Sequence, residues 1–215
     1  MPAPIAAILF DDAPPGSQAW ANLAPLLDLR PAFDLRTGAR TTLDRHASDP
    51  RLRVVSVDAV SFLAGAPASG ERFASRAFSQ ALAEAAPAIA SPTLMLSARC
   101  PLLPEETLAL RPGQSIVEAR SGDLVAAMLD EAQRQEFFGD AHATVFRDQR
   151  AIDRPLLLQR PWDVIRFRDA CMAHDLAAML AGTPHDDSRR FTVDGDESRL
   201  RVHPSAHVAP NVVFD

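Results

Sequence analysis

Residues 4–12 read PIAAILFDD: seven residues without a charge end at a pair of aspartates. So short an apolar run, followed directly by loop-forming residues, predicts a buried β-strand. Two further short runs, residues 53–57 (RVVSV) and 93–97 (TLMLS), predict strands of the same kind. Between them, residues 71–86 are rich in alanine and predict a helix that ends at Pro87. Strands that alternate with helices predict an α/β domain around a mainly parallel sheet with helices on both faces.

Other segments complete this expected α/β domain. The predicted elements, in chain order, are an ordered loop over 23–38, a short helix over 41–47, a weaker strand over 115–119, a long helix over 122–138, a strand over 156–159 and a helix over 162–180 that stops at Gly182. No internal repeat interrupts the first 190 residues. We therefore assign residues 1–190 to one domain.

The last residues differ in kind. Residues 202–215 (VHPSAHVAPNVVFD) place Val202, Val208 and Phe214 six apart, with small and turn-forming residues between them. A six-residue period headed by an aliphatic residue is typical of hexapeptide β-helices, and the alternative is a polar tail with accidental spacing. Residues 202–215 are thus predicted as the start of a truncated left-handed β-helix. The connector, residues 191–201, contains the dipeptide Asp194-Gly195 and is predicted as a hairpin.

This C-terminal segment is too short to fold by itself. It supplies fewer than three hexads, and roughly three repeats are needed for a stable coil. We expect it to run as an extended strand, packed on the parent domain through Val202 and Val208 or paired with a neighbouring chain. The fragment is then expected to be a monomer or a weak dimer.

Composition narrows the function. The 215 residues carry a net charge of −6 without a visible basic stripe, so nucleic-acid binding is not expected. A basic leader and a run of about 20 apolar residues are both missing, which predicts a cytoplasmic protein without membrane contact. Cys100 and Cys171 are interpreted as reduced, buried thiols, with a disulfide as the alternative. All 22 basic residues are arginines. Any phosphate must therefore be bound by arginine forks, helix N-termini or backbone amides.

Several polar residues follow predicted strands or lie in loops. Asp11 and Asp12 come after the first strand and Arg99 after the third, and the carboxyl ends of parallel strands line the ligand crevice of α/β folds. One of the two aspartates is a candidate for a metal or a sugar hydroxyl. Arg30, before Pro31, and Arg36 are candidate phosphate ligands, since a guanidinium binds phosphate through two hydrogen bonds. Gly38 permits a close backbone approach or a turn with positive φ.

Four segments, taken in order, resemble a known family: ILFDD (8–12), LAPLLDLRPAFDLRTG (23–38), LMLSARCPLLP (94–104) and RPWDVIRFRDACMAHDL (160–176). Together with the hexapeptide start they are similar to divergent bacterial sugar nucleotidyltransferases, related to the bifunctional UDP-N-acetylglucosamine pyrophosphorylase/glucosamine-1-phosphate N-acetyltransferase. The resemblance implies a Rossmann-like nucleotidyltransferase domain followed by a β-helix, and a natural trimer. It also implies the formation of a nucleotide sugar and pyrophosphate from a nucleoside triphosphate (UTP) and a sugar 1-phosphate (N-acetylglucosamine 1-phosphate), with Mg²⁺.

The resemblance assigns roles to particular residues. It implies a catalytic role for Arg30 and Asp163, and a magnesium site at Asp11 and Asp163; the residue pattern alone allows Asp163 to be a helix N-cap. Trp162 is expected in the core. The sequence departs from the wider superfamily in three places: Phe10-Asp11-Asp12 stands where a glycine-rich loop is usual, Ala32 where a lysine is usual, and Ala98-Arg99 where a Gly-Asp pair is usual. These departures leave open an alternative function, a non-catalytic sugar-nucleotide-binding module that regulates or caps a β-helix acyltransferase domain.

Overall fold

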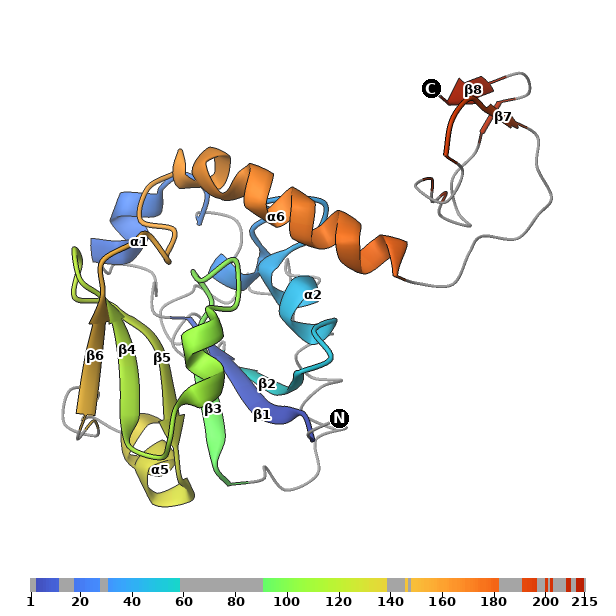
Figure 1. Ribbon diagram of the computed structural model, residues 1–215. Helices are drawn as coiled ribbons and strands as arrows, with labels where there is room; N and C mark the ends of the chain where they lie inside the picture. The colour runs from blue at the N-terminus through green and yellow to red at the C-terminus, as the bar shows by residue number, and fades with distance from the viewer. Residues whose placement is uncertain are drawn as a thin grey trace, which may run out of the picture.

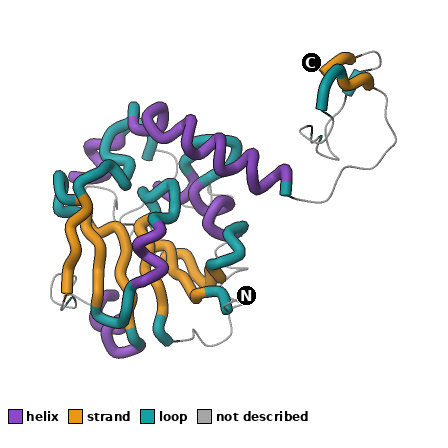
Figure 2. Tube along the Cα trace, viewed as in Figure 1, coloured by secondary structure: helices purple, strands orange, loops and turns teal. Residues whose placement is uncertain are grey.

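The computed structural model of the chain describes residues 3–11, 18–27, 31–58, 91–138, 146, 148–181, 191–196, 200, 202, 208–209 and 212–214 (Figure 1). The predicted loop at residue 12 and helix at 71–86 lie outside these residues. The described part of residues 3–181 builds around one six-stranded sheet, whose strands are drawn in orange in Figure 2.

The strand order of this sheet is β2-β1-β3-β5-β4-β6. The strands are β1 (Ile5–Phe10), β2 (Leu52–Asp58), β3 (Thr93–Ser97), β4 (Gln114–Glu118), β5 (Leu124–Leu129) and β6 (Asp148–Ile152). β1 pairs in parallel with β2 and β3, and β4 in parallel with β6, whereas β5 is antiparallel to both of its neighbours. The sheet is mostly parallel, as the sequence predicted, and the carboxyl ends of five strands meet at one edge.

Alternating residues of the strands pack into two hydrophobic cores, one on each face of the sheet. Ala7 and Leu9 of β1 pack on one face with side chains of α1 (Gln18–Leu23), α2 (Thr42–Ala47) and α6 (Asp163–Leu180). Ile8 and Phe10 pack on the other face with Phe137 of α5 (Glu131–Phe138). Helices on both faces are therefore confirmed. Two 3₁₀ helices, η1 (Ala32–Asp34) and η3 (Glu105–Ala109), complete the connections.

The prediction of one long helix over residues 122–138 is wrong. It splits into strand β5 and helix α5, separated by Asp130. The sequence of β5, LVAAML, is apolar without a break, so helix and strand periods could not be told apart. Its place between β3 and β4, where five of its six residues are buried, selects the strand.

The predicted strand at 156–159 is also wrong. Leu156, Leu157 and Leu158 are buried, but they lie in an irregular segment. The sixth strand is instead β6, which the sequence did not suggest because four of its five residues are exposed and polar or small. β6 is an edge strand, and only its last residue, Ile152, is buried.

Two assignments at the start of α6 are corrected as well. Trp162, expected in the core, has 60% of its surface exposed. The residue in the N-cap position is Trp162, without a side-chain hydrogen bond to the helix, and Asp163 is the first helical residue. The carboxylate of Asp163 binds the chain that precedes the helix, as described below.

At the C-terminus, β7 (Phe191–Val193) pairs in parallel with β8 (Val212–Phe214). The rings of Phe191 and Phe214 meet edge to face, with centroids 5.3 Å apart. β7 thus has a parallel partner in β8, and residues 197–199 and 201, which belong to the second half of the predicted hairpin, lie outside the described residues, so the hairpin stays a prediction. Residues 212–214 are extended, as expected, while the β-helix assignment of residues 202–215 stays a prediction.

Candidate functional site

The carboxyl ends of β1 and β3 bring two predicted site residues together. The backbone N–H of Ala98 donates to the carbonyl of Phe10 at 2.8 Å, which extends the pairing past the ends of both strands. Asp11 and Arg99 each follow by one residue, and both are buried, with 3% and 1% exposed surface. The Asp11 carboxylate accepts a hydrogen bond from the backbone of Ala32 at 3.3 Å. It thus links the end of β1 to the segment after the Arg30-Pro31 pair.

Arg99 points toward the β4–β5 turn and the segment before α6. Its guanidinium donates to the Gln159 side-chain oxygen at 3.0 Å and to the Asp123 carboxylate at 2.9 Å. Burial raises the pKa of Asp123, but the hydrogen bond from Gln159 and the charge of Arg99 outweigh it and hold that pKa below its ordinary value. Arg99 is therefore a buried cation with its countercharge in place, and its position is fixed by both contacts.

Gln159 connects this pair to two more carboxylates. Its amide nitrogen donates to Glu118 Oε2 at 3.0 Å and to Asp123 Oδ2 at 2.9 Å, while its backbone N–H donates to Asp163 Oδ2 at 2.8 Å. The side chain and the backbone of this one residue thus join the ends of β3 and β4 to the start of α6. The orientation of its amide is set by these partners, because the oxygen faces Arg99 and the nitrogen faces carboxylates.

Glu118, the last residue of β4, holds the segment before α6 in its irregular shape. Its Oε1 accepts from the backbone amides of Leu156 at 2.7 Å and Leu157 at 3.2 Å, and Oε2 accepts from the Ser121 hydroxyl at 3.0 Å. Buried amides need partners. The carboxylate provides them in place of a neighbouring strand, which explains why this apolar segment is buried without being a strand.

Asp163 has a similar role at the helix start. Its Oδ2 accepts from the backbone amides of Gln159 and Arg160, both at 2.8 Å, and its Oδ1 lies 2.8 Å from a guanidinium nitrogen of Arg166. Asp163 is 1% exposed, whereas the Arg166 side chain is 51% exposed. A single carboxylate thus fixes the turn before α6 and one arginine of its first turn.

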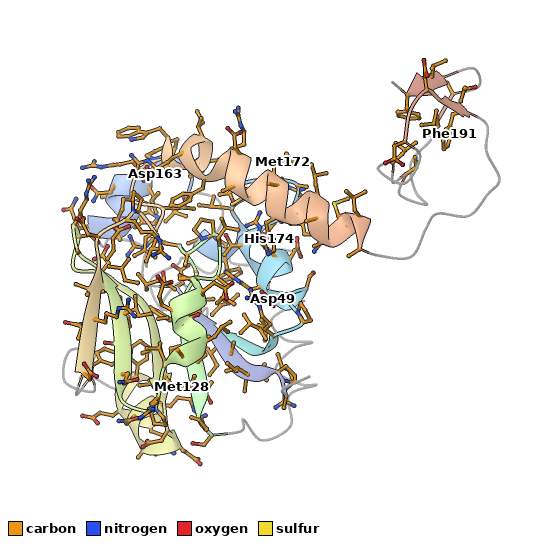
Figure 3. The ribbon with its side chains drawn as sticks, viewed as in Figure 1. Asp49, Met128, Asp163, Met172, His174 and Phe191 are labelled. Atoms are coloured by element: carbon orange, nitrogen blue, oxygen red, sulfur yellow. The ribbon has the colours of Figure 1, made fainter. Side chains whose placement is uncertain are left out.

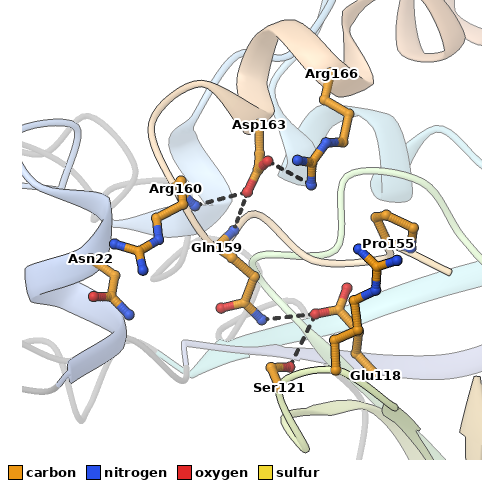
Figure 4. A pocket seen from close by; sticks show the side chains of 9 residues that line it. Asn22, Glu118, Ser121, Pro155, Gln159, Arg160, Asp163 and Arg166 are labelled. Atoms are coloured by element: carbon orange, nitrogen blue, oxygen red, sulfur yellow. Dashed lines mark hydrogen bonds and ion pairs between the residues drawn. The ribbon is translucent and has the colours of Figure 1, made fainter. Parts of the chain in front are cut away.

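A pocket of about 320 Å³ opens between these elements (Figure 4). Asn22 of α1 borders it on one side, and Glu118 and Ser121 border it at the β4–β5 turn. Gln159 and Asp163 border it on the α6 side. The remaining lining residues are Pro155 and three arginines, Arg120, Arg160 and Arg166. The three guanidinium groups outnumber the two carboxylates of Glu118 and Asp163, so the lining carries a net positive charge.

Residues 35–41, which include two predicted site residues, pack against a different part of α6. A Cβ atom on Gly38 would lie 2.8 Å from Asp175 Oδ2 and 3.1 Å from the Cys171 backbone, so this glycine permits close contact with the helix. Arg36 is exposed and donates to the carbonyl of Ala39 in its own loop. Cys171 and Asp175 lie eight and twelve residues beyond Asp163, roughly 12–18 Å along the helix axis. Figure 3 shows the same stretch of α6, from Asp163 past Met172 to His174.

Of the predicted site residues, the structure joins Arg99 to Asp163 through Gln159 and sets Asp11 beside Arg99. It places Arg36 and Gly38 at the loop on the later turns of α6. Arg30 and Asp12 lie outside the described residues. The sequence reasoning missed Arg120, Arg160 and Arg166.

The sequence positions of these three arginines gave only weak indications of a site. Arg120 follows the end of β4 by two residues, and Arg160 and Arg166 belong to the segment 160–176, already singled out as a motif. The spacing of three between Asp163 and Arg166 is that of neighbours on one helix face, which could have indicated their ion pair.

A magnesium ion would need carboxylate ligands from the chain. Within the described part of the chain, no group of three His, Cys, Asp or Glu side chains gathers as a metal site. Asp163 Oδ2 accepts from two backbone amides, and its Oδ1, which has no hydrogen-bond partner among the described residues, lies 2.8 Å from an Arg166 guanidinium nitrogen whose positive charge opposes a bound cation. Magnesium in proteins is commonly held by one or two carboxylates and the phosphates of the substrate. Of the two aspartates predicted as magnesium ligands, Asp11 is buried, accepts from the Ala32 backbone and follows β1 beside Arg99.

Comparison with known proteins gives the class. A family described as "Sugar nucleotidyl transferase" matches residues 7–183, which is most of the chain and contains the six-stranded sheet except the first two residues of β1, the pocket and α6. The chain therefore belongs to the sugar nucleotidyl transferase family. Neither a curated protein nor a solved structure matches it. Such a family membership implies a nucleotide and a sugar phosphate as substrates.

Of the helices in the described residues, none has the length and apolar character needed to cross a bilayer.

Proposed function

We propose that this chain is a sugar-1-phosphate nucleotidyltransferase that makes a nucleotide sugar and pyrophosphate. The observation that carries the proposal is the arginine-lined pocket at the carboxyl edge of the sheet, in a chain whose family transfers nucleotides to sugars. As specific substrates we propose UTP and N-acetylglucosamine 1-phosphate, on the resemblance of the four sequence segments to the bifunctional pyrophosphorylase/acetyltransferase family. The same resemblance supports a longer trimeric natural protein, in which residues 202–215 begin a β-helix.

In the proposed reaction, a phosphate oxygen of the sugar 1-phosphate attacks the α-phosphorus of the nucleoside triphosphate. The new P–O bond forms as the bond to the leaving pyrophosphate breaks, so no oxidant or further reactant is needed. The chemistry requires two polyanions to approach each other, and positioning and charge neutralisation supply most of the rate enhancement in phosphoryl transfer. In a chain without lysine, this task falls to the guanidinium groups.

We propose that Mg²⁺, bound mainly by the triphosphate with Asp11 as the protein ligand, supplies additional charge neutralisation. The chain's own residues hold the substrates. Arg99, fixed by Gln159 and Asp123, shapes the boundary between the end of β3 and the pocket. Glu118 and Asp163 keep the lining segment 155–160 in place through its backbone amides.

The test is release of pyrophosphate by the full chain with UTP, Mg²⁺ and a panel of sugar 1-phosphates. We expect release that needs both substrates and is highest with N-acetylglucosamine 1-phosphate. Repeating the panel with the other nucleoside triphosphates tests the base. Absence of release with every pair of substrates would overturn the proposed catalysis.

The rival function is a binding module of the same fold. One observation favours it: Glu118 and Asp163, the two carboxylates of the pocket, are both engaged by the chain's own amides. Binding of a nucleotide sugar without turnover of any substrate pair would establish this rival.

A further inference from the structure

We infer that the pocket is the subsite for the phosphorylated sugar, and that Arg160 and Arg166 bind its phosphate while Asp163 positions both arginines. The inference deepens the proposed function and rests on it, because it assigns one of the two substrates to a described set of residues. If the pocket binds the sugar phosphate, the nucleotide must bind at another place along the carboxyl edge of the sheet.

The first argument is charge. Three arginines and two carboxylates line the pocket, but the carboxylates accept hydrogen bonds from Leu156, Leu157, Gln159 and Arg160 backbone amides. The guanidinium of Arg160 lies 6.0 Å from the centroid of the exposed Trp162 ring, and among the described residues no carboxylate forms an ion pair with it. Arg120 reaches Asp153 at 4.0 Å, and both side chains are largely exposed, so that pair is weak. An anion is therefore the ligand that this pocket favours.

The second argument is the shape and the remaining lining. A volume of about 320 Å³ lies at the small end of ligand pockets. Asn22 and Ser121 add an amide and a hydroxyl, the groups that pair with sugar hydroxyls. Among the described residues that line the pocket there is no aromatic side chain against which a nucleobase could stack. The combination favours a phosphorylated sugar over a nucleotide.

The third argument is preorganisation by Asp163. One of its oxygens binds the backbone of Arg160 and the other pairs with the guanidinium of Arg166. The buried Asp163 carboxylate thus contacts both arginines that we assign to the phosphate: it holds the backbone of Arg160 and the guanidinium of Arg166. Arg166 is half exposed, so a phosphate can join Asp163 as its partner without uncovering a buried group. Asp163 is a positioning residue in this scheme.

The experiment is calorimetric binding to the full chain, with N-acetylglucosamine 1-phosphate, neutral N-acetylglucosamine and UTP as three separate probes. The variants are Arg160→Gln and Arg166→Gln, and the matched control is Arg168→Gln. Arg168 lies on the same helix, is 61% exposed and pairs with Asp169 outside the pocket. Each pocket variant should weaken binding of the sugar phosphate about tenfold or more, the loss expected for a charge-assisted hydrogen bond. UTP affinity should stay within twofold, and the control should match the wild type with every probe.

The outcomes separate this inference from the proposed function, since binding is measured without turnover. Sugar-phosphate affinities within twofold of wild type in both variants would overturn the subsite, even if pyrophosphate release is active. So would an equal loss of UTP affinity, which would assign the arginines to the nucleotide, or a wild-type protein that binds neutral N-acetylglucosamine as tightly as its phosphate. Retained, arginine-dependent binding in a protein without turnover would support the subsite and contradict the catalysis.

Asp163→Asn tests the positioning role. The amide oxygen can still accept from the two backbone amides, but the amide nitrogen would face Arg166. In the active enzyme we expect the KM for the sugar 1-phosphate to rise about tenfold while the KM for UTP is unchanged. A merely structural role would lower the amount of folded enzyme and shift neither KM selectively, and that result would contradict the assignment.

Discussion

Arg45 and Asp175, 130 residues apart in the chain, form a two-contact ion pair from which solvent is excluded. The Arg45 Nε lies 2.7 Å from one carboxylate oxygen and a terminal nitrogen lies 2.9 Å from the other. The remaining nitrogen donates to the Thr37 hydroxyl at 3.1 Å and to the Pro101 carbonyl at 2.9 Å. The pair fastens α2, the loop 35–41 and the segment after β3 to one turn of α6. It thereby fixes the helix whose first turn lines the pocket.

Asp175→Asn should destabilise the protein by about 3–5 kcal/mol, because it leaves the buried Arg45 charge without a partner. Urea unfolding at pH 7.5 measures the change. The matched control is Asp169→Asn on the same helix, where the carboxylate is exposed and pairs with Arg168. We expect the control to have the same midpoint of urea unfolding as the wild type. Equal midpoints for the two variants would contradict the role assigned to the buried pair.

Gly38→Ala should destabilise the protein by about 1–3 kcal/mol, since the new methyl group would overlap Asp175 Oδ2 and the Cys171 backbone. Thermal unfolding measures it. Gly122→Ala is the control: a Cβ there meets nothing within 4 Å, and its cost is the strain of an alanine at φ +73°, about 1–2 kcal/mol. If both variants also keep the affinity for nucleotide, Gly38 serves packing and not ligand approach. A Gly38→Ala protein as stable as the wild type would show that the loop yields to the methyl group.

The sequence predicted those parts of the fold in which local pattern and tertiary environment agree. β1, β2 and β3 are short apolar runs bounded by loop residues, and α2 begins at a genuine cap, where the Thr41 hydroxyl accepts from the Asp44 amide at 3.1 Å. Where the two disagree, prediction failed. Residues 124–129 are good helix formers, yet they are placed between two strands, and β6 is polar because it is an edge.

In the candidate site, too, only the residues that a local sequence pattern marks could be predicted. Asp11 and Arg99 could be predicted because strand ends were recognised, and the topology then brought them together. The network of Glu118, Gln159 and Asp163 could not, because its contacts are to backbone amides of segment 156–160, and no residue pattern reports such partners. The three pocket arginines are separated by up to 46 positions in the chain and converge only through the pairing of β4 with β6 and the course of the segment before α6.

His46 predicts a pH dependence of stability. It is fully buried, and burial lowers its pKa to about 4, with the Arg45 charge acting in the same direction; its Nε2–H donates a hydrogen bond to the Cys100 carbonyl at 2.8 Å. Below about pH 6.5 the unfolded chain takes up a proton at this residue that the folded chain does not. Stability from neutral His46 is therefore fully present above pH 6.5 and lost as the pH falls toward 4, by about 3 kcal/mol in total.

Urea unfolding of wild type and His46→Gln at intervals from pH 7.5 to 4.5 tests this dependence. Glutamine cannot titrate, so the variant should lose less stability than the wild type over the same interval, whatever its stability at pH 7.5. Parallel curves for the two proteins would show that another group dominates the acid response in this range.

Gln159→Glu should weaken the pocket in a pH-dependent way. The change replaces the amide nitrogen, which donates to Glu118 at 3.0 Å and Asp123 at 2.9 Å, with an oxygen that repels both carboxylates. At pH 8 we expect a loss of about 2 kcal/mol, the usual cost of unsatisfied buried groups, which corresponds to a thermal midpoint roughly 4–8 °C lower. As the pH falls to 5.5, one carboxyl of the crowded group takes up a proton and donates again, so the difference from wild type should shrink.

Gln149→Glu, on the exposed edge strand β6, adds the same charge outside the pocket and should show neither effect. Scanning calorimetry of the three proteins at both pH values decides the matter: a Gln159→Glu midpoint equal to that of Gln149→Glu at pH 8, or a gap that widens in acid, would remove Gln159 from the centre of the network that holds the pocket open.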